Sequence, residues 1–306
     1  MIDRVSVVMP AYNAMPYIKE AVTSVLAQTF SSFEFLIVND GSTDDTKVYI
    51  DSLNDPRIRV IHQTNQGIVT ALNVGIREAK HDWIARMDAD DVALPQRLQR
   101  QVEFLEWDPQ YALIGCGWGY IGRNGRRMKA TQKHKLTQPP YYQPLIDQMI
   151  LDQGMLFKKS AVIKVGGYRG IGNSSEGSEG IDLCLRLDEA GYHMTSIPDL
   201  LMLVRVLPSG ISAKRFIQQR LMRKFYRECS NARRMGKGEP EQEKFIKEHW
   251  PRGFRLLRYI GAREFRLAGS AWGAGYYFSA GYRLFLSSVL HPRYVLSKFG
   301  TYFLGK

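Results

Sequence analysis

Three aspartates, Asp88, Asp90 and Asp91, stand within four positions, shortly after the apolar pair Trp83-Ile84. Carboxylates this close repel one another, so a folded protein keeps such a cluster where a cation neutralises it or solvent surrounds it. Mg²⁺ and Mn²⁺ prefer oxygen ligands, and Mg²⁺ commonly binds one or two carboxylates together with substrate phosphates. The cluster is therefore either a divalent-ion site that binds a diphosphate or a solvated acidic turn, and an isolated D-x-D pattern favours the turn.

The elements expected around the cluster favour the ion site. Apolar, β-branched runs predict buried parallel strands, and amphipathic periodicity predicts helices between them. The strands are expected at 5–9, 33–38, 57–62 and 82–87, and the helices at 16–26 and 66–80. Ligands of such α/β folds bind beyond the carboxyl ends of the strands. Polar segments follow three of these strands, so we expect them to meet in one crevice: 10–13, 39–42 and 88–91.

The remaining elements complete an α/β fold with a mostly parallel sheet and flanking helices. Asn39-Asp40-Gly41 predicts a turn, after which Ser42 or Thr43 is expected to cap a helix. Further elements are a helix at 95–107, a strand at 112–121, a basic polar loop at 124–135, a strand and helix at 157–165, a mobile Gly/Ser-rich segment at 170–180 and a helix at 181–190. From residue 213 we expect basic helices with a polar linker at 230–242, which gives two domains, 1–210 and 211–306.

Composition limits the class of protein. The chain has 306 residues, and its 44% apolar content supports a buried core. Its three cysteines, Cys116, Cys184 and Cys229, show no paired spacing, which argues against a disulfide framework or a zinc site. The first residues lack the basic and apolar regions of a signal peptide. We therefore expect a cytoplasmic protein in a reducing compartment.

Positive charge is concentrated in the last third of the chain. Residues 205–306 hold 21 Lys and Arg against 6 Asp and Glu, a net charge of +15, whereas residues 1–204 hold 21 against 24. Such asymmetry predicts an anionic partner, here an anionic membrane surface, or else a solvated helical face. No aromatic RNA-binding or zinc pattern accompanies it, so nucleic acid is not expected. Residues 267–290 carry a single charge and fit an interfacial helix pair better than a spanning helix.

Four motifs in order along the chain resemble those of the family 2 glycosyltransferases, which have the GT-A fold. The motifs are Val7-Val-Met-Pro-Ala-Tyr-Asn13, Asn39-Asp-Gly-Ser-Thr-Asp44, Ala71-Leu-Asn-Val-Gly-Ile76 and Arg86-Met-Asp-Ala-Asp-Asp91, followed by Pro95 and Arg97. Linked motifs are far more specific than any one alone, and the resemblance covers about residues 4–210. It implies a nucleotide-sugar donor, a UDP-sugar being favoured, with Mn²⁺ or Mg²⁺ and inversion at the anomeric carbon.

The resemblance also implies roles for single residues. The first donor-binding motif corresponds to Pro10, Ala11, Tyr12 and Asn13. Asp40 matches the acid that contacts the nucleotide base. From the residues alone, however, Pro10 also fits the end of a strand and Asp40 a turn.

The second half of the donor site follows from the later motifs. Asp88 and Asp90 match the D-x-D pair, with Asp90 as a direct metal ligand and Asp88 on the ribose or the metal. Asp91 is expected to lie next to these two ligands without binding the ion directly. Asn73 falls where relatives carry Arg-Asn, but Leu72 replaces the arginine, so this helix supplies no assured cation for the phosphates.

The acceptor half departs from the family pattern. In the segment that usually holds the catalytic base, Gly180 stands where an aspartate is expected, and glycine accepts no proton. Glu179 or Asp182 then takes over as base, or Glu176 does, or the chain binds donor with little or no transfer. Asp182 also fits a helix cap. Two further differences are Leu207 in place of a histidine that faces the metal and Asp152, a weaker base candidate, in place of another histidine.

The sequence thus predicts a metal-dependent glycosyltransferase that moves a sugar from a nucleotide diphosphate to a glycan or lipid-linked glycan at a membrane surface. The alternative is a donor-binding protein without turnover. A polymerising enzyme tends to carry Gln-x-x-Arg-Trp after the base, and Gln218-Gln-Arg-Leu-Met222 does not match, so addition of a single sugar is favoured.

Overall fold

The computed structural model of the chain describes residues 2–132, 154–170, 179–207, 216–251, 254–273, 277–292 and 295. The chain divides into two compact units. The first comprises Met1–Trp118, Lys133–Gly170 and Glu179–Leu203, and the second comprises Gly119–Gln132, Ile171–Ser178 and Val204–Lys306. A functional boundary at residue 210 stays a prediction.

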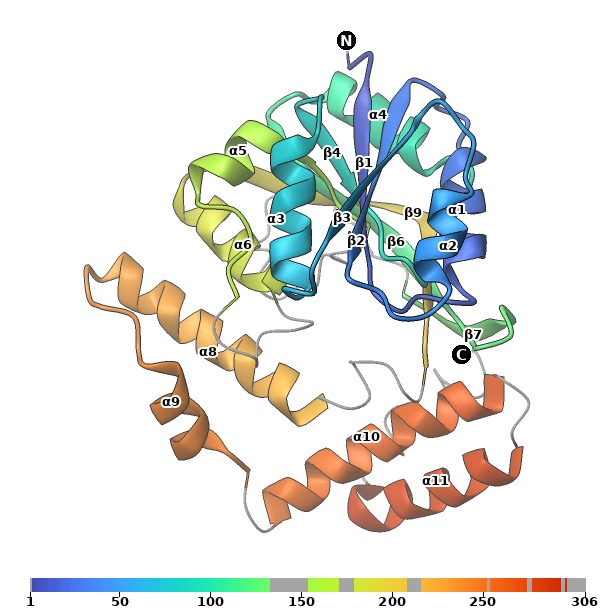
Figure 1. The fold of residues 1–306 in the computed structure, drawn as a ribbon. Helices are drawn as coiled ribbons and strands as arrows, with labels where there is room; N and C mark the ends of the chain where they lie inside the picture. The colour runs from blue at the N-terminus through green and yellow to red at the C-terminus, as the bar shows by residue number, and fades with distance from the viewer. Residues whose placement is uncertain are drawn as a thin grey trace. The chain divides into compact units, whose positions relative to one another are not determined.

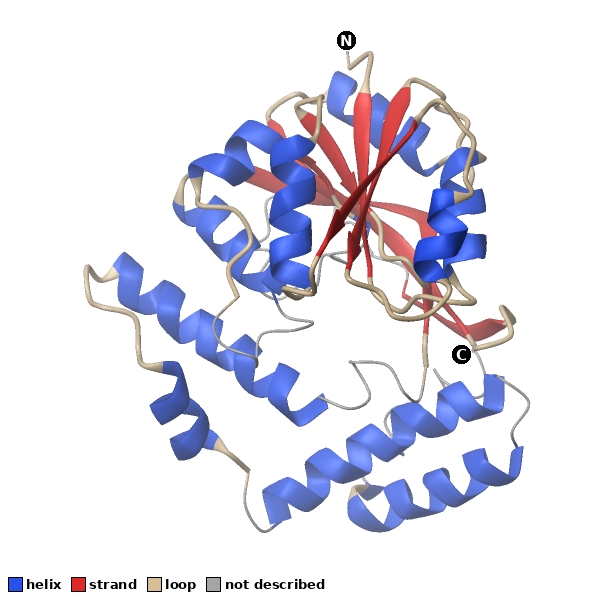
Figure 2. Ribbon diagram, in the orientation of Figure 1, coloured by secondary structure: helices blue, strands red, loops and turns tan. Residues whose placement is uncertain are grey.

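A sheet with flanking helices forms the first unit (Figures 1 and 2). Its early elements are β1 (Val5–Ala11), α1 (Ile18–Leu26), β2 (Phe33–Asp40), α2 (Thr46–Asp51), β3 (Ile58–Gln63), α3 (Ile68–Glu78), β4 (Trp83–Arg86) and β5 (Val92–Ala93). The later ones are α4 (Arg97–Trp107), β6 (Tyr111–Ile121), β7 (Arg127–Gln132), β8 (Leu156–Lys158), α5 (Lys159–Lys164), α6 (Glu179–Glu189) and β9 (His193–Arg205), of which β7 belongs to the second unit.

The described strands are ordered β3-β2-β1-β4-β8-β6-β9-β5, and β7 pairs with β6. β1, β2, β3 and β4 pair in parallel, as their apolar runs predict. The partners of β8 and β9 are antiparallel, so the sheet is mixed. The predicted α/β class with flanking helices is confirmed.

The core explains why these segments pack as they do. α3, α5 and α6 share one apolar cluster with the sheet, in which Leu72, Val162 and Leu183 are nearly inaccessible to solvent. α3 lies very close to β1: a Cβ added at Gly75 would be 2.4 Å from Val8 Cγ1. Only glycine allows this approach at that position. This is the physical reason for the glycine in the third of the four motifs.

Two local predictions are wrong. The expected loop at 124–135 contains strand β7, which follows a turn at Gly125 (φ +73°) and pairs with β6. α2 begins at Thr46, after Asp45, so neither Ser42 nor Thr43 caps it. The expected linker at 230–242 is confirmed over 235–241, because α8 (Phe216–Arg234) continues to Arg234. β9 was not expected, because its polar residues and proline mask the strand pattern.

The second unit contains the basic helices α8, α9 (Gln242–His249), α10 (Phe254–Gly273) and α11 (Tyr277–Leu290). α8 and α9 meet through aromatic rings, with Phe225 and Phe245 5.3 Å apart between ring centroids. α10 packs against α11, and β7 contacts α10. The low-charge run 267–290 is therefore divided between two helices. Among the described helices, none combines the length and apolarity needed to cross a bilayer. The predicted mobility at 170–180 falls mostly on residues outside the described ranges.

Candidate functional site

The carboxyl ends of β1, β2 and β4 lie at the same edge of the sheet. Ala11 pairs with Asn39 across β1 and β2, and Arg86 pairs with Val8 across β4 and β1. The Met87 amide continues this pairing by donating to the Val8 carbonyl at 3.0 Å. The segments 10–13, 39–42 and 88–91 follow directly from these positions. The three segments therefore leave the sheet at the same edge, as predicted, and their meeting in one crevice stays a prediction.

Asn13 joins the first two segments. It has a left-handed backbone (φ +47°), and its amide donates to Ser42 Oγ at 3.0 Å. Its side-chain Oδ1 accepts from the Thr43 amide at 2.7 Å. Ser42 and Thr43 therefore fix this turn instead of capping a helix. Next to them, Pro10 and Ala11 are buried in β1, whereas Tyr12 is half exposed and can meet a ligand with its ring.

Asp40 is buried at the end of β2 and fixes the start of α3. Its Oδ1 accepts from Gln63 Nε2 at 2.7 Å and from the Gln66 amide at 2.9 Å. Its Oδ2 accepts from the Gly67 amide at 2.9 Å. Asp40 thus connects the ends of β2 and β3 with the first residue of α3. A contact to a nucleotide base would use the remaining acceptor capacity of this carboxylate.

The acidic cluster has the composition and spacing of a divalent-ion site. One carboxylate oxygen from each of Asp88, Asp90 and Asp91 lies within 4.8 Å of the others. Two oxygens on opposite sides of one Mg²⁺ lie about 4.2 Å apart, so a small adjustment would bring this set around one ion. All the donors are oxygens, which suits Mg²⁺ or Mn²⁺. Asp91 is the buried member of the three. The residues present therefore fit the ion that the sequence predicts.

A buried arginine that the sequence reading missed lies beside this cluster. Arg86 is 2% exposed, and its Nη2 lies 3.3 Å from Asp88 Oδ1 and 3.4 Å from Glu179 Oε1. Its guanidinium also lies over the Tyr168 ring, 5.5 Å from the centroid. Burial disfavours its charge, yet Asp88, Tyr168 and Glu179 together raise the pKa of Arg86 above its usual value. Arg86 links the D-x-D segment to α6. An arginine ending an otherwise apolar strand was the available signal.

Arg97, which follows the fourth motif, contacts the end of β4 next to the acidic cluster. It is buried, and its Nη2 donates to the carbonyls of Arg86 at 2.7 Å and Met155 at 3.2 Å. Burial lowers the pKa of Arg97, and the nearby Cys116, Asp91 and Asp88 oppose that effect. Its role is to fix the backbone that leads into the acidic residues.

Asn73 contacts a different segment from the one the resemblance implies. Its Nδ2 donates to the Tyr168 carbonyl at 2.7 Å, and its Oδ1 accepts from the Tyr168 amide at 2.9 Å. A Cβ at Gly167 would lie 2.6 Å from Asn73 Oδ1, so this pairing requires glycine beside it. Asn73 therefore attaches α3 to the segment after α5. A direct contact from Asn73 to a donor stays a prediction.

The two base candidates of the acceptor half lie in the first turn of α6. Asp182 is fully buried, and its Oδ1 accepts from Arg169 Nη2 at 2.7 Å. Its Oδ2 accepts from Arg169 Nε at 3.0 Å and Arg186 Nε at 2.8 Å. Glu179 is 1% exposed and faces Arg86. Gly180 lies between them on the same turn. The other candidates, Asp152 and Glu176, lie outside the described residues.

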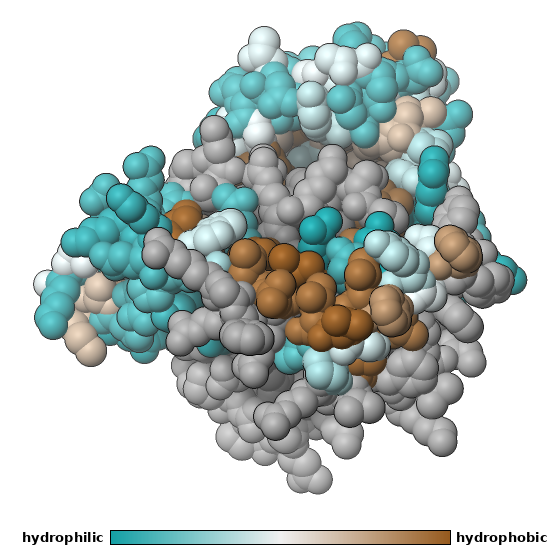
Figure 3. Space-filling model, turned by 90° about the horizontal axis from the view of Figure 1, so that it is seen from below, coloured by the Kyte–Doolittle hydropathy of each residue, from teal (hydrophilic) through white to brown (hydrophobic). Residues whose placement is uncertain are grey.

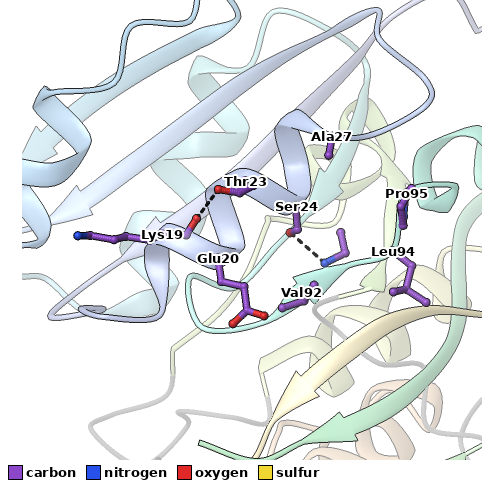
Figure 4. A pocket seen from close by; sticks show the side chains of 9 residues that line it. Lys19, Glu20, Thr23, Ser24, Ala27, Val92, Leu94 and Pro95 are labelled. Carbon is purple, nitrogen blue, oxygen red and sulfur yellow. Dashed lines mark hydrogen bonds between the residues drawn. The ribbon is translucent and has the colours of Figure 1, made fainter. Parts of the chain in front are cut away.

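A shallow pocket of about 520 Å³ lies elsewhere, between α1 and the segment after Asp91 (Figure 4). Its lining is mainly apolar and comes from Lys19, Glu20, Thr23, Ser24, Ala27 and 92–95. Ser24 Oγ there accepts from the Ala93 amide at 3.1 Å and connects α1 to β5. The pocket contains none of the predicted donor-binding or metal-ligating residues.

Solved structures share this architecture. The Pyrobaculum calidifontis mannosyltransferase PcManGT, solved with GDP-Man and Mn²⁺, is similar over 97% of this chain and 79% of its own, with a TM-score of 0.56 and 19% identity. Residues 1–349 of Staphylococcus aureus TarS, solved with UDP-GlcNAc, are similar over 96% of this chain and 92% of their own, with a TM-score of 0.59 and 14% identity. These likenesses confirm the GT-A fold.

Sequence relatives identify the family. The Bacillus subtilis (strain 168) glycosyltransferase EpsE is 32% identical over 211 residues, which are 66% of this chain and 73% of that protein. EpsJ of the same organism is 40% identical over 120 residues, 39% of this chain but only 35% of its own length. The model of the family described as Glycosyl transferase family 2 matches residues 6–166 of this chain. The chain belongs to this family of transferases.

Proposed function

We propose that this chain is a metal-dependent glycosyltransferase that moves a sugar from a nucleotide diphosphate, in the first instance a UDP-sugar, to a glycan or lipid-linked glycan. The observation that carries the proposal is that three strand ends lie at one edge of the sheet, and that β4 is followed there by three carboxylates whose oxygens lie within 4.8 Å. The related structures with GDP-Man and Mn²⁺ or with UDP-GlcNAc support it.

The residues at this edge have distinct proposed roles. Asp90 and Asp88 would hold Mn²⁺ or Mg²⁺, and the bound ion would supply positive charge to stabilise the departing diphosphate. Tyr12 meets the nucleotide with its exposed ring, and Asn13 keeps the turn that presents it. Asp40 orders the residues that open α3 on the base side. Displacement by the acceptor hydroxyl from the opposite face inverts the anomeric carbon, which NMR of the product would reveal.

The general base that accepts the proton of the acceptor hydroxyl has the weakest candidates among the residues of the site. Both oxygens of Asp182 accept from guanidinium groups, which leaves little capacity for a proton from an acceptor hydroxyl. Glu179 lies one residue before Gly180, the position where the resemblance places the base, and its Oε1 is 3.4 Å from Arg86 Nη2 beside the acidic cluster. We therefore keep Glu179 as the base candidate and assign Asp182 to positioning α6.

A donor-binding protein without turnover is the second candidate function. It is favoured by the pairing of both α6 carboxylates with arginines and by Gly180 at the expected base position. Both functions include binding of the nucleotide-sugar donor. They differ in whether the acceptor half supplies a base, so that the sugar is transferred.

Transfer and hydrolysis of UDP-sugars with Mn²⁺ separate the two functions. For a working Glu179, the Glu179→Gln variant loses about 100-fold in turnover, because a positioned base contributes roughly that factor. For a chain without turnover, the natural protein is inactive and Gly180→Asp gains activity. Gly180→Ala is the control, since it adds a side chain at this buried helical position without a carboxylate. Absence of donor binding in all variants would contradict both functions.

The proposed location of the acceptor is an anionic membrane surface on the cytoplasmic side. The net charge of +15 over residues 205–306 supports this part of the proposal. About 1 kcal/mol per Lys or Arg near an anionic surface makes a few such residues sufficient for reversible attachment.

A further inference from the structure

In helix α11 four large apolar side chains are exposed, whereas Leu284 packs against the cluster that contains Phe265 and Ala268 of α10. Phe278, Tyr282, Phe285 and Val289 are 94%, 61%, 65% and 63% exposed. Their spacing of four, three and four residues places them within about 60° around the helix. Four large apolar residues on one exposed stripe form the kind of contiguous patch that marks a contact surface.

The opposite side of α11 is occupied by α10. Ala280 and Ser287 are buried there, and Ser287 Oγ donates to the Gly261 carbonyl at 2.7 Å. Arg283 Nη1 pairs with Glu264 Oε2 at 2.5 Å. The helix is therefore fixed in its rotation by small and polar contacts to α10. Because the rotation is fixed, the exposed stripe lies opposite the α10 contact and cannot also pack against α10.

A basic turn belongs to the same unit. Arg123, Arg126 and Arg127 are exposed around Gly125 in the β6–β7 turn, and within the described residues no carboxylate pairs with them. Residues 119–132 contain four Lys and Arg and no Asp or Glu. β7 contacts α10, and α10 packs against α11. One compact unit thus carries both an aromatic stripe and exposed arginines.

We propose that the α11 stripe (Phe278, Tyr282, Phe285 and Val289) inserts into the headgroup layer of an anionic lipid surface, with the arginine turn (Arg123, Arg126 and Arg127) binding the lipid phosphates. Amphipathic helices with aromatic residues lie in this layer, and basic side chains bind anionic headgroups. The side of the molecule on which α11 lies shows hydrophobic residues gathered beside hydrophilic ones (Figure 3).

Charge favours lipid over a second copy of the chain. Residues 254–290 hold five arginines and one glutamate, and residues 119–132 hold four more positive charges. A second copy would bring the same positive charges to the contact, whereas anionic lipid neutralises them. This inference deepens the membrane part of the proposed function, because it specifies the surface that attaches.

The test is sedimentation of the full chain with vesicles of phosphatidylcholine containing phosphatidylglycerol, against vesicles of phosphatidylcholine alone. We expect binding to the anionic vesicles, falling as salt rises. Replacing Arg123, Arg126 and Arg127 by Gln weakens binding about fivefold per arginine and reduces its dependence on salt. Phe278→Ser with Phe285→Ser weakens binding about tenfold per residue without changing that dependence.

Matched variants in the first unit control for general loss of apolar surface or charge. Val48→Ser with Trp107→Ser removes two large side chains that are 70% and 68% exposed there. Arg77, Lys80 and Lys158 replaced by Gln remove three exposed charges. Both controls should bind vesicles like the natural chain. Thermal unfolding should be unchanged in all four variants, since only exposed side chains are replaced.

Three results would overturn the inference. These are no binding to anionic vesicles, equal binding by the α11 variant, or dissociation of a dimer in ultracentrifugation by the α11 variant, which would place a second copy on the stripe. Donor hydrolysis measured without vesicles is expected to be the same in every variant. If the glycosyltransferase proposal fails, donor hydrolysis will be absent in every variant, whereas vesicle binding still tests the membrane proposal.

Discussion

The carboxylates after β4 and those on α6 are both acidic groups of the first unit, but they have different surroundings. Asp182 on α6 is fully buried and accepts three hydrogen bonds from Arg169 and Arg186. Asp88, Asp90 and Asp91 instead lie next to one another, with their oxygens within 4.8 Å. On α6 each buried carboxylate faces a guanidinium group. After β4, three carboxylates are gathered, and Asp88 among them also lies 3.3 Å from Arg86 Nη2.

We propose that this difference separates an acid that positions an element from acids that bind an ion. A buried carboxylate matched by cations is satisfied within the protein, and removing one partner leaves an uncompensated charge. Gathered carboxylates repel one another, and a divalent ion bound among them would relieve that repulsion. Three variants break or sharpen this comparison, ordered by the size of the expected effect.

Asp90→Asn should have the largest effect. It removes a negative charge and one proposed ligand from the ion site, so we expect Mn²⁺ affinity to fall and turnover to drop about 1,000-fold. Titration calorimetry with Mn²⁺, alone and with UDP, measures the loss. Folding should be unaffected or improved, because repulsion within the cluster decreases.

Asp108→Asn is the matched control for Asp90→Asn, since Asp108 ends α4 outside the cluster and contacts Gln110. It should leave Mn²⁺ binding unchanged. Equal Mn²⁺ affinity in the natural chain and the Asp90 variant would remove the basis for an ion site.

Asp182→Asn should act mainly on stability. The two arginines would keep their charges without the carboxylate, and breaking a buried pair costs about 3 kcal/mol or more. We expect the free energy of unfolding, measured in urea, to fall by about that amount. Donor binding should survive at temperatures where the variant is folded.

Asp51→Asn is the comparison for Asp182→Asn, because Asp51 forms exposed contacts with Lys47 at 2.6 Å and with His62 Nε2 at 2.9 Å. An exposed pair of this kind contributes less than about 1 kcal/mol. If Asp182→Asn leaves stability unchanged and abolishes transfer, Asp182 is the base after all, and the assignment of α6 as positioned by arginines is wrong.

Asn73→Ala should have the smallest effect of the three. It removes two hydrogen bonds to the Tyr168 backbone and leaves a partly buried peptide group less satisfied, which costs about 2 kcal/mol. We expect that loss of stability with little change in donor affinity. A large drop in UDP affinity at full stability would instead restore the donor-binding role that the resemblance implies.

Much of the first unit followed from the sequence, for identifiable reasons. Strands buried on both faces, such as 33–38, are continuous apolar runs, and α1 has a clear helical period, so each carries its own signal. The carboxyl ends of parallel strands must share one edge, and this alone placed Asp40 and the Asp88–Asp91 segment at the same edge of the sheet. The motifs then supplied the chemical identity.

Pairings between segments were not predictable in the same way. Residues 127–132 have no strand pattern of their own, and β7 forms by pairing with the preceding strand β6 across the turn at Gly125. Asp182 on α6 pairs with Arg169 in the segment after α5, and this pairing, which the sequence does not show, is the basis for proposing that Asp182 positions α6. Arg86 was missed because buried arginines are rare and its partners come from two other segments.

The close approach of α3 to β1 at Gly75 has a consequence for how the site could diverge. Val8, which Gly75 touches, stands two residues before Pro10, and Asn73 on the same helix fixes the backbone of Tyr168. A single methyl group at position 75 would push the helix outward and displace both regions at once. Changes in substrate preference should therefore accumulate in loops on either side of α3, while its distance from the sheet stays constant.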